Sequence, residues 1–254
     1  MSVLDSIKEK AKADVKHILL PEGSEERTVQ AARIITDEKI AKVTLLGDEE
    51  EIKKVAEKFN VCLCGIDIIN PLTDPDFEHY ANGFYELRKA KGMTPEKALA
   101  TMQDETFFGT MMMKKNAADG MVSGAIHSTA DTLRPALQII KTKPGVTTAS
   151  SCFVMEIPNK AYGQDGVMIF ADCAVNITPD AQQLAAIAIA SAQTAKDIAE
   201  IAEPKVAMLS FSTKGSGKGE MVDKVRQATE LVKELAPELN VDGELQADAA
   251  LIEK

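Results

Sequence analysis

Short apolar runs alternate with amphipathic segments through much of the chain. Lys16–Leu20 and Lys42–Leu46 are apolar enough to form buried strands. Between them, Val29, Ala32 and Ile35 recur at the spacing of one helix face. Strand, helix and strand in this order are typical of a parallel sheet covered by helices. The pattern therefore predicts an α/β fold.

The rest of the first half follows the same alternation. Thr94-Pro95-Glu96 predicts a helix start, because threonine caps well and proline suits the first helical position. The methionines at 111–113 are expected in the core, where their flexible side chains fill gaps. The other predicted elements are a helix capped by Ser24, a helix over Glu49–Phe59, a loop over Asn70–His79, a short helix over Phe84–Lys91, and the end of a strand over Ala118–Val122.

The pattern changes after Lys141–Gly145, the best candidate for a linker. Two β-rich runs, Val146–Ile157 and Gly166–Val175, are joined by a turn-rich segment, which predicts an antiparallel hairpin. The remaining predicted elements are a helix over Pro179–Ile201, a buried strand over Val206–Phe211, a helix over Glu220–Leu235 and a strand end over Asp242–Leu245. We expect two α/β domains with three-layer parallel or mixed sheets, residues 1–145 and 146–254, with a ligand cleft between them.

Composition and charge exclude several classes of function. The chain is 45% hydrophobic, and no apolar run approaches the roughly 20 residues that cross a bilayer. Met1–Val15 is charged and amphipathic, unlike a secretory signal, so we expect a cytoplasmic protein without a membrane partner. The net charge of -10 and the 4% aromatic content argue against nucleic-acid binding.

The four cysteines indicate neither a metal site nor a disulfide framework. Four in 254 residues fit a reducing compartment, and the Cys62-Leu63-Cys64 pair has no second pair at zinc spacing. Cys152 and Cys173 lie in apolar strand-like runs, where thiols are usually inert, so a covalent acyl-enzyme is not expected. The sequence predicts no bound metal or resident cofactor.

The segment Ser123–Pro135, SGAIHSTADTLRP, has the composition of an anion site. It follows an apolar strand end and opens a helix, whose unpaired N–H groups and partial positive charge favour a phosphate. Arg134 adds a planar cationic fork suited to phosphate oxygens. An ordinary helix cap with Arg134 on a solvated face explains the same residues. The candidate caps are Ser128, Thr129, Asp131 and Thr132.

A second candidate, Ser210–Gly219 or SFSTKGSGKG, lies between a predicted buried strand and a helix. Its glycines and hydroxyls could wrap a phosphate or the pyrophosphate of coenzyme A. It is not a P-loop, because Ser212 and Gly219 stand where that motif needs glycine and a hydroxyl residue. A flexible turn without a ligand remains an equal alternative at this point.

Four segments in register resemble the phosphate acetyltransferases, also called phosphotransacetylases, of the phosphate acetyl/butyryltransferase family. They are Ser123–Pro135, Tyr85–Gly92, Lys205–Gly219 and Glu234–Ala250. The resemblance implies reversible acetyl transfer in acetate metabolism, in which acetyl-CoA and phosphate give coenzyme A and acetyl phosphate. It also implies a fold like that of isocitrate and isopropylmalate dehydrogenases, a homodimer, and coenzyme A as substrate rather than cofactor.

The resemblance implies roles for individual residues. The family's arginines at the positions of Arg88 and Arg134 are implicated in binding coenzyme A and the phosphoryl group, and we expect Arg134 to be catalytic. The family works by direct attack of the coenzyme A thiol in a ternary complex, without an acyl-enzyme. His127 could be a general base on generic grounds, but the sequence identifies no acid partner and the family does not assign its base there. The expected substrate-binding residues are Arg88, His127, Ser128, Thr129, Ser212, Thr213 and Lys214.

Family members continue past the position of Lys254 into a segment with a Ser-Arg pair and the aspartate base. We therefore expect a truncated chain that binds ligands weakly and turns over slowly or not at all. Two alternatives stay open: a phosphate butyryltransferase, and a non-catalytic module that binds acetyl-CoA for regulation. A generic NAD oxidoreductase lacks the nucleotide fingerprint.

Overall fold

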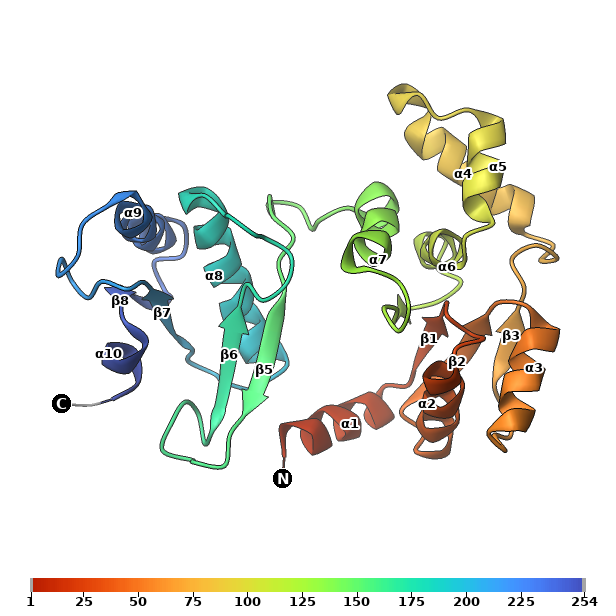
Figure 1. Ribbon diagram of the computed structural model, residues 1–254, viewed down its shortest axis with the longest axis horizontal. Helices are drawn as coiled ribbons and strands as arrows, with labels where there is room; N and C mark the ends of the chain where they lie inside the picture. Colours follow the sequence, from red (N-terminus) through yellow and green to blue (C-terminus); the bar gives the residue numbers. More distant parts are fainter. Residues whose placement is uncertain (1, 253–254) are drawn as a thin grey trace. The chain divides into compact units, whose positions relative to one another are not determined.

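The computed structural model describes residues 2–252, which divide into two compact units (Figure 1). Asp5–Lys141 form the first, here the N-terminal unit. Nearly all the other described residues, from Thr142 onward, form the second, here the C-terminal unit. No described helix is long and apolar enough to cross a membrane.

The N-terminal unit is built on a four-stranded parallel sheet of order β3-β2-β1-β4. Its strands are β1 (Lys16–Leu20), β2 (Ala41–Leu46), β3 (Asp67–Ile69) and β4 (Gly120–Met121). Its helices are α1 (Val3–Ala13), α2 (Glu26–Asp37), α3 (Glu49–Lys58), α4 (Phe77–Arg88), α5 (Pro95–Met102), α6 (Glu105–Lys114) and α7 (Thr129–Pro135), with a 3-10 turn at Lys89–Lys91 and a π-helical turn at Ala136–Ile140. The predicted α/β fold with a parallel sheet is confirmed.

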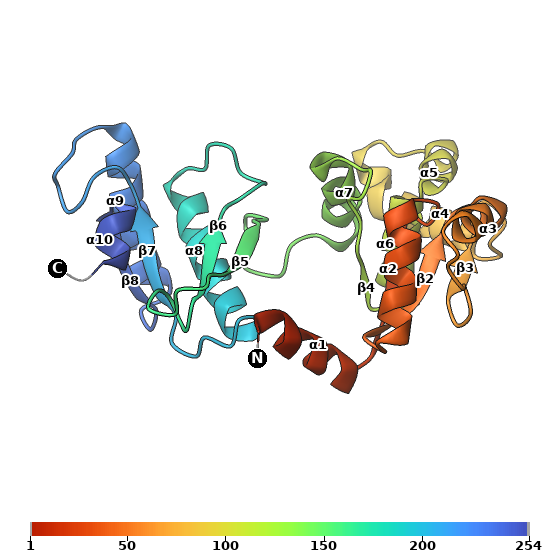
Figure 2. The same ribbon diagram turned by 60° about the horizontal axis from the view of Figure 1, so that its bottom comes forward.

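Helices cover both faces of this sheet. Leu19 and Leu20 are neighbours on β1, yet Leu19 packs with the helices α4 to α6 and Leu20 packs with α2 and α3. Alternate side chains of a strand point to opposite faces, so each strand supplies two cores. Figure 2 shows α2 lying along the strands on one side of the sheet. The unit therefore has three layers.

Some local predictions in this unit need correction. Glu25 caps α2 in place of Ser24, because its carboxylate accepts the N–H groups of Arg27 and Thr28. The helix α4 begins at Phe77, inside the predicted loop, because its turns bury Tyr80, Ala81 and Phe84. Thr94 caps α5 as predicted. Met111 and Met112 are buried, which confirms the expected core methionines.

The C-terminal unit contains two separate two-stranded sheets. The strands β5 (Cys152–Glu156) and β6 (Val167–Ala171) pair antiparallel, as the hairpin prediction required. The parallel pair is β7 (Lys205–Leu209) with β8 (Asn240–Leu245). The helices are α8 (Ala181–Asp197), α9 (Glu220–Leu235) and α10 (Ala247–Leu251). Small residues such as Ala185, Ala188 and Ala228 let α8 and α9 pack closely over β7 and β8.

The cysteines differ from expectation at one place. Cys62 and Cys64 form a disulfide in the loop after α3, where free thiols were predicted. The turn of this loop brings their Cα atoms to 5.5 Å, within the usual disulfide range. Cα atoms two residues apart always lie near this distance, because consecutive Cα atoms are about 3.8 Å apart. The side-chain directions in the loop, which the sequence does not show, decide whether the two sulfurs meet. Cys152 and Cys173 are free.

Candidate functional site

The predicted anion segment lies at the carboxyl edge of the N-terminal sheet. The strand β4 ends at Met121, and the chain continues through the Val122–His127 loop into α7. The strand β1 pairs with β2 on one side and with β4 on the other, so the order of strands reverses between β1 and β4. Open α/β sheets bind ligands outside the carboxyl ends of their strands at such a switch point.

The residue that caps α7 is Ser128, one of the four candidates that the sequence offered. Its hydroxyl accepts the N–H of Asp131 at 3.2 Å and donates to the Asp131 carboxylate at 2.6 Å. Thr129 is the first helical residue and is exposed. Local capping chemistry therefore fixes the start of this helix.

A buried carboxylate organises the loop that precedes α7. Glu22 follows the end of β1 and is only 4% exposed. One carboxylate oxygen accepts the N–H groups of Gly124 and Ala125 at 3.0 and 2.8 Å. The other accepts those of Ile126 and His127, both at 2.8 Å. The loop has the backbone of an anion nest, and a side chain of the same chain fills it.

Glu22 is ionised despite its burial. Desolvation by burial raises the pKa of this carboxyl, but the N–H groups of Ile126, His127 and Ala125 and the imidazole of His127 outweigh it. Together they lower the pKa to about 2. The Nδ1 atom of His127 lies 2.8 Å from the same carboxylate oxygen. The structure thus supplies the acid partner that sequence reasoning did not find for His127.

Several polar groups of the predicted segment have few or no partners in the chain. Arg134 has one ion pair, 3.3 Å from Asp131, and its side chain is 56% exposed. Among the described residues, the buried hydroxyl oxygens of Ser123 and Thr132 have no hydrogen-bond partner. Arg88, at the end of α4 in the same unit, also has a buried Nε atom with no hydrogen-bond partner in the part of the chain that the structure describes. An anion bound here would compete only with the exposed Arg134–Asp131 ion pair among the contacts of these groups.

A second unusual carboxyl lies near this edge. Glu105 begins α6, and a Cβ added at Gly47, just after β2, would lie 3.1 Å from its Oε1 atom. Burial, helped by the negative charges of Asp104 and Glu22 and opposed by His127, raises the pKa of Glu105 to about 7. Sequence reasoning missed both glutamates. Their position directly after a strand or at a helix start was the available signal.

The second candidate segment lies in the C-terminal unit and is also built around a carboxylate. Ser212 is fully buried; its hydroxyl donates to Glu244 at 3.0 Å and accepts the N–H of Gly217 at 2.9 Å. The Glu244 carboxylate also accepts from Gly215 N–H and from the guanidinium of Arg226. Arg226 and then the Gly215 N–H lower the pKa of Glu244 far below its usual range. Contacts within the chain therefore stabilise the turn at 212–217.

Thr213 and Lys214 extend outward from this turn and have contacts in the chain. The hydroxyl of Thr213 is 3.2 Å from the side-chain oxygen of Gln246, and it accepts the Gln246 N–H at 2.9 Å. Lys214 forms an ion pair with Asp242. A ligand that used Lys214 would have to share the ammonium with this carboxylate.

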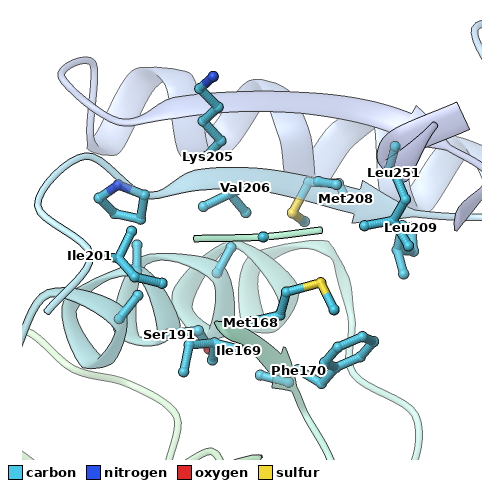
Figure 3. A pocket seen from close by; sticks show the side chains of 18 of the residues that line it. Met168, Ile169, Phe170, Ser191, Ile201, Lys205, Val206, Met208, Leu209 and Leu251 are labelled. Atoms are coloured by element: carbon cyan, nitrogen blue, oxygen red, sulfur yellow. The ribbon is translucent and has the colours of Figure 1, made fainter. Parts of the chain in front are cut away.

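The structure contains two notable cavities. One of about 410 Å³ lies in the N-terminal unit and is lined by Glu22, Arg27, Ser123 and Ala125 with apolar residues of β1 and α2. It therefore adjoins the loop held by Glu22. The other, of about 560 Å³, lies in the C-terminal unit and is lined mainly by apolar side chains of β6, α8 and β7 (Figure 3). None of the predicted site residues lines the larger cavity.

Comparison with known proteins gives a consistent result. Residues 2–254 match the family described as "Phosphate acetyl/butaryl transferase". Two curated relatives, both named phosphate acetyltransferase, come from Thermoanaerobacterium thermosaccharolyticum, 55% identical over 254 residues, and Clostridium acetobutylicum, 52% identical over 251. The matches cover 100% and 99% of this chain and 76% and 75% of those proteins.

A solved phosphotransacetylase from Streptococcus pyogenes is similar in structure as well, with a TM-score of 0.90 at 48% identity. The match covers 98% of this chain and 75% of that one. A phosphotransacetylase from Staphylococcus aureus gives a TM-score of 0.86 at 42% identity. The chain spans about three-quarters of the length of the proteins it matches.

Proposed function

This chain belongs to the phosphate acetyl/butaryl transferase family, and we propose that its phosphate-side site is the carboxyl edge of the N-terminal sheet. The reaction is that of the phosphate acetyltransferases: acetyl-CoA and phosphate give coenzyme A and acetyl phosphate, reversibly. Coenzyme A takes part as a substrate. The butyryl-specific and non-catalytic alternatives have no support in the relatives' names.

One observation carries the choice of site. The start of α7 follows the switch point between β1 and β4. The same helix carries the guanidinium of Arg134, whose ion pair with Asp131 is exposed. An exposed pair of this kind is worth about 1 kcal/mol or less, so Arg134 can exchange Asp131 for a phosphate at little cost. Its planar fork can hold two phosphoryl oxygens at once. We assign Arg134 the catalytic role.

The neighbouring residues complete the phosphate side of the site. Ser128 and Thr129 supply hydroxyls and backbone N–H groups at the start of α7, and His127 supplies an imidazole edge. Arg88 has an unpartnered buried Nε and we assign it to the phosphates of coenzyme A or of the acyl donor. In the other unit, we assign Thr213 and Lys214 to coenzyme A, with Ser212 holding the turn that presents them.

The chemistry proposed for this site is direct transfer. The coenzyme A sulfur attacks the carbonyl carbon of acetyl phosphate, the C–S bond forms, and the C–O bond to phosphorus breaks. The thiol proton leaves to a base, and phosphate departs with the electron pair of the broken bond. Arg134 stabilises the charge that gathers on the departing phosphate, and backbone N–H groups stabilise the charge on the carbonyl oxygen. No free cysteine is needed.

Four further features remain proposals. We propose two domains at residues 1–145 and 146–254, arranged as in isocitrate and isopropylmalate dehydrogenases. We also propose a homodimer in the cytoplasm. Small-angle scattering tests the domain arrangement, analytical ultracentrifugation tests the dimer, and cell fractionation tests the location.

The test is acetyl-CoA formation from acetyl phosphate and coenzyme A, followed through the thioester. Wild type is compared with R134Q and with R33Q, a matched control that removes a guanidinium bound to Asp37 and loop carbonyls. Loss of a charge-stabilising donor costs about 100-fold or more in kcat. We expect that loss in R134Q and near wild-type turnover in R33Q. Equal activity in R134Q and wild type would place the site elsewhere.

A further inference from the structure

Glu22 contacts more of the candidate site than any residue predicted from sequence. Its two oxygens accept four consecutive backbone N–H groups, from Gly124 to His127. A fifth contact joins it to the Nδ1 atom of His127 at 2.8 Å. Removing this carboxylate would leave four N–H groups without an acceptor in a partly buried loop, which is costly. The conformation of the loop therefore depends on Glu22.

The same contact determines where the proton of the imidazole lies. A carboxylate is an acceptor only, so Nδ1 of His127 must carry the hydrogen in the 2.8 Å contact. In the neutral ring the other nitrogen, Nε2, then has a lone pair and accepts hydrogen bonds. His127 lies directly before the cap of α7, and its side chain is 26% exposed. Nε2 is the ring nitrogen left for a ligand.

We propose that Glu22 is a positioning residue of this site: it holds the Gly124–His127 loop and fixes His127 as an Nδ1–H tautomer whose Nε2 accepts a hydrogen bond from the phosphate substrate. The identity of the ligand, phosphate, rests on the proposed function. Hydrogen phosphate carries a P–OH group that can donate to Nε2. The acetyl phosphate dianion carries none, so the two substrates of the same subsite should depend differently on Glu22.

The first experiment measures the tautomer and needs no activity. The chain has three histidines, so the imidazole nitrogens of His127 can be assigned by NMR with H127Q as reference. We expect the Nδ1–H form in wild type. In E22Q the side chain loses its negative charge, and its neutral amide oxygen accepts the Nδ1–H more weakly, so the Nε2–H form should gain population. A wild-type Nε2–H form, or an unchanged tautomer in folded E22Q, would overturn the proposal.

The matched control is D119N. Asp119 also accepts a backbone N–H of the sheet, that of His17 at 2.8 Å, but at the opposite end of β1. We expect its substitution to leave the His127 signals unchanged. If E22Q does not fold, the wild-type spectrum still shows which tautomer His127 adopts. E22D is then the second variant, because it keeps a carboxylate at this position.

The second experiment separates positioning from general loss of structure. Replacing the carboxylate that orients a metal-ligating histidine costs about tenfold or more, and we expect a similar scale for His127. Loss of the Glu22 contacts to the loop should raise KM for both substrates, and loss of the tautomer should raise KM for phosphate about tenfold more than KM for acetyl phosphate. An equal rise in both would contradict the assigned role of Nε2. Absence of any transferase activity in the chain extended with the family's C-terminal segment would refute the proposed function, while the NMR result would still report on Glu22.

Discussion

Glu22 and Glu105 show how environment sets the charge of a carboxyl at the scale of one residue. Both lie near the carboxyl edge of the N-terminal sheet and both are shielded from water. Against the effect of burial, three backbone N–H groups and the His127 imidazole lower the pKa of Glu22 to about 2, so its charge is kept over most of the acid range. Burial and neighbouring negative charges raise the pKa of Glu105 to about 7. Hydrogen-bond donors, rather than depth alone, decide the difference.

The raised pKa of Glu105 makes stability depend on pH. The unfolded chain ionises this carboxyl near its usual 4.5 and the folded chain near 7, so between these values the folded state binds more protons. The contribution of Glu105 to stability is therefore fully present below pH 4.5 and is lost as the pH rises through 7. For a half-buried group, solvent screening reduces the loss to about 1–2 kcal/mol.

We therefore expect E105Q to be more stable than wild type above pH 7 by about 1–2 kcal/mol, and to show a flatter pH profile. Urea unfolding at one pH below and one pH above the pKa of Glu105 measures the free energy of unfolding of both proteins. E26Q is the control, because Glu26 also lies in the first turn of a helix but is exposed. Parallel pH profiles for E105Q and wild type would refute the assigned environment.

Helix starts carry much of the specificity at the scale of elements. The side chain of Ser128 caps α7 and so sets where the loop ends and the helix begins. In the other unit, Asp180 and Gln183 form a reciprocal capping box at the start of α8, with contacts of 2.8 and 3.0 Å. Both caps satisfy N–H groups that the helix itself cannot pair. Such residues set where an element begins, and a composition-based prediction misses them by a few positions.

Removal of the α8 cap should have a measurable cost. D180A deletes the acceptor for the Gln183 N–H and half of the capping box, so we expect a loss of about 1 kcal/mol in the free energy of unfolding. The comparison is D197A at the last residue of the same helix, where a negative charge is not favoured by the helix dipole. Denaturant midpoints measure both. A larger loss in D197A would contradict the capping assignment.

The cores of the two units are separate at the scale of the whole molecule. Two buried clusters, around Phe84 and Val29, consist only of residues before Lys141. The third, around Ala185, consists only of residues after it. The segment from Lys141 to Gly145 is exposed. Each unit thus has the independent apolar interior expected of a folding unit.

Limited trypsin digestion should find this boundary. Lys141 and Lys143 are both exposed, but Pro144 blocks cleavage after Lys143, so we expect the first cut after Lys141. Mass spectrometry would then give two fragments that meet between residues 141 and 142. K141Q should delay their appearance. An earlier cut inside α4 or α9 would show that the boundary is not the least stable part of the chain.

Much of the fold was predictable from local pattern. The strands at Lys16–Leu20 and Cys152–Glu156, the cap at Thr94 and the buried methionines follow from periodicity and capping rules, which act over a few residues. The start of α4 was not predictable in this way. Its first turns contain polar residues typical of a loop, and packing of Tyr80 and Phe84 decides the outcome.

By itself, the sequence determined that the chain is α/β, which family it resembles, and which segments hold anion-binding side chains. Only the tertiary structure decided what those segments contact. Glu22 and His127 are 105 residues apart and meet because β1 and β4 lie side by side in parallel. Glu244 reaches Ser212 in the same way across β7 and β8. Composition predicts that a loop can bind an anion, but chain topology decides whether a carboxylate of the same chain already occupies it.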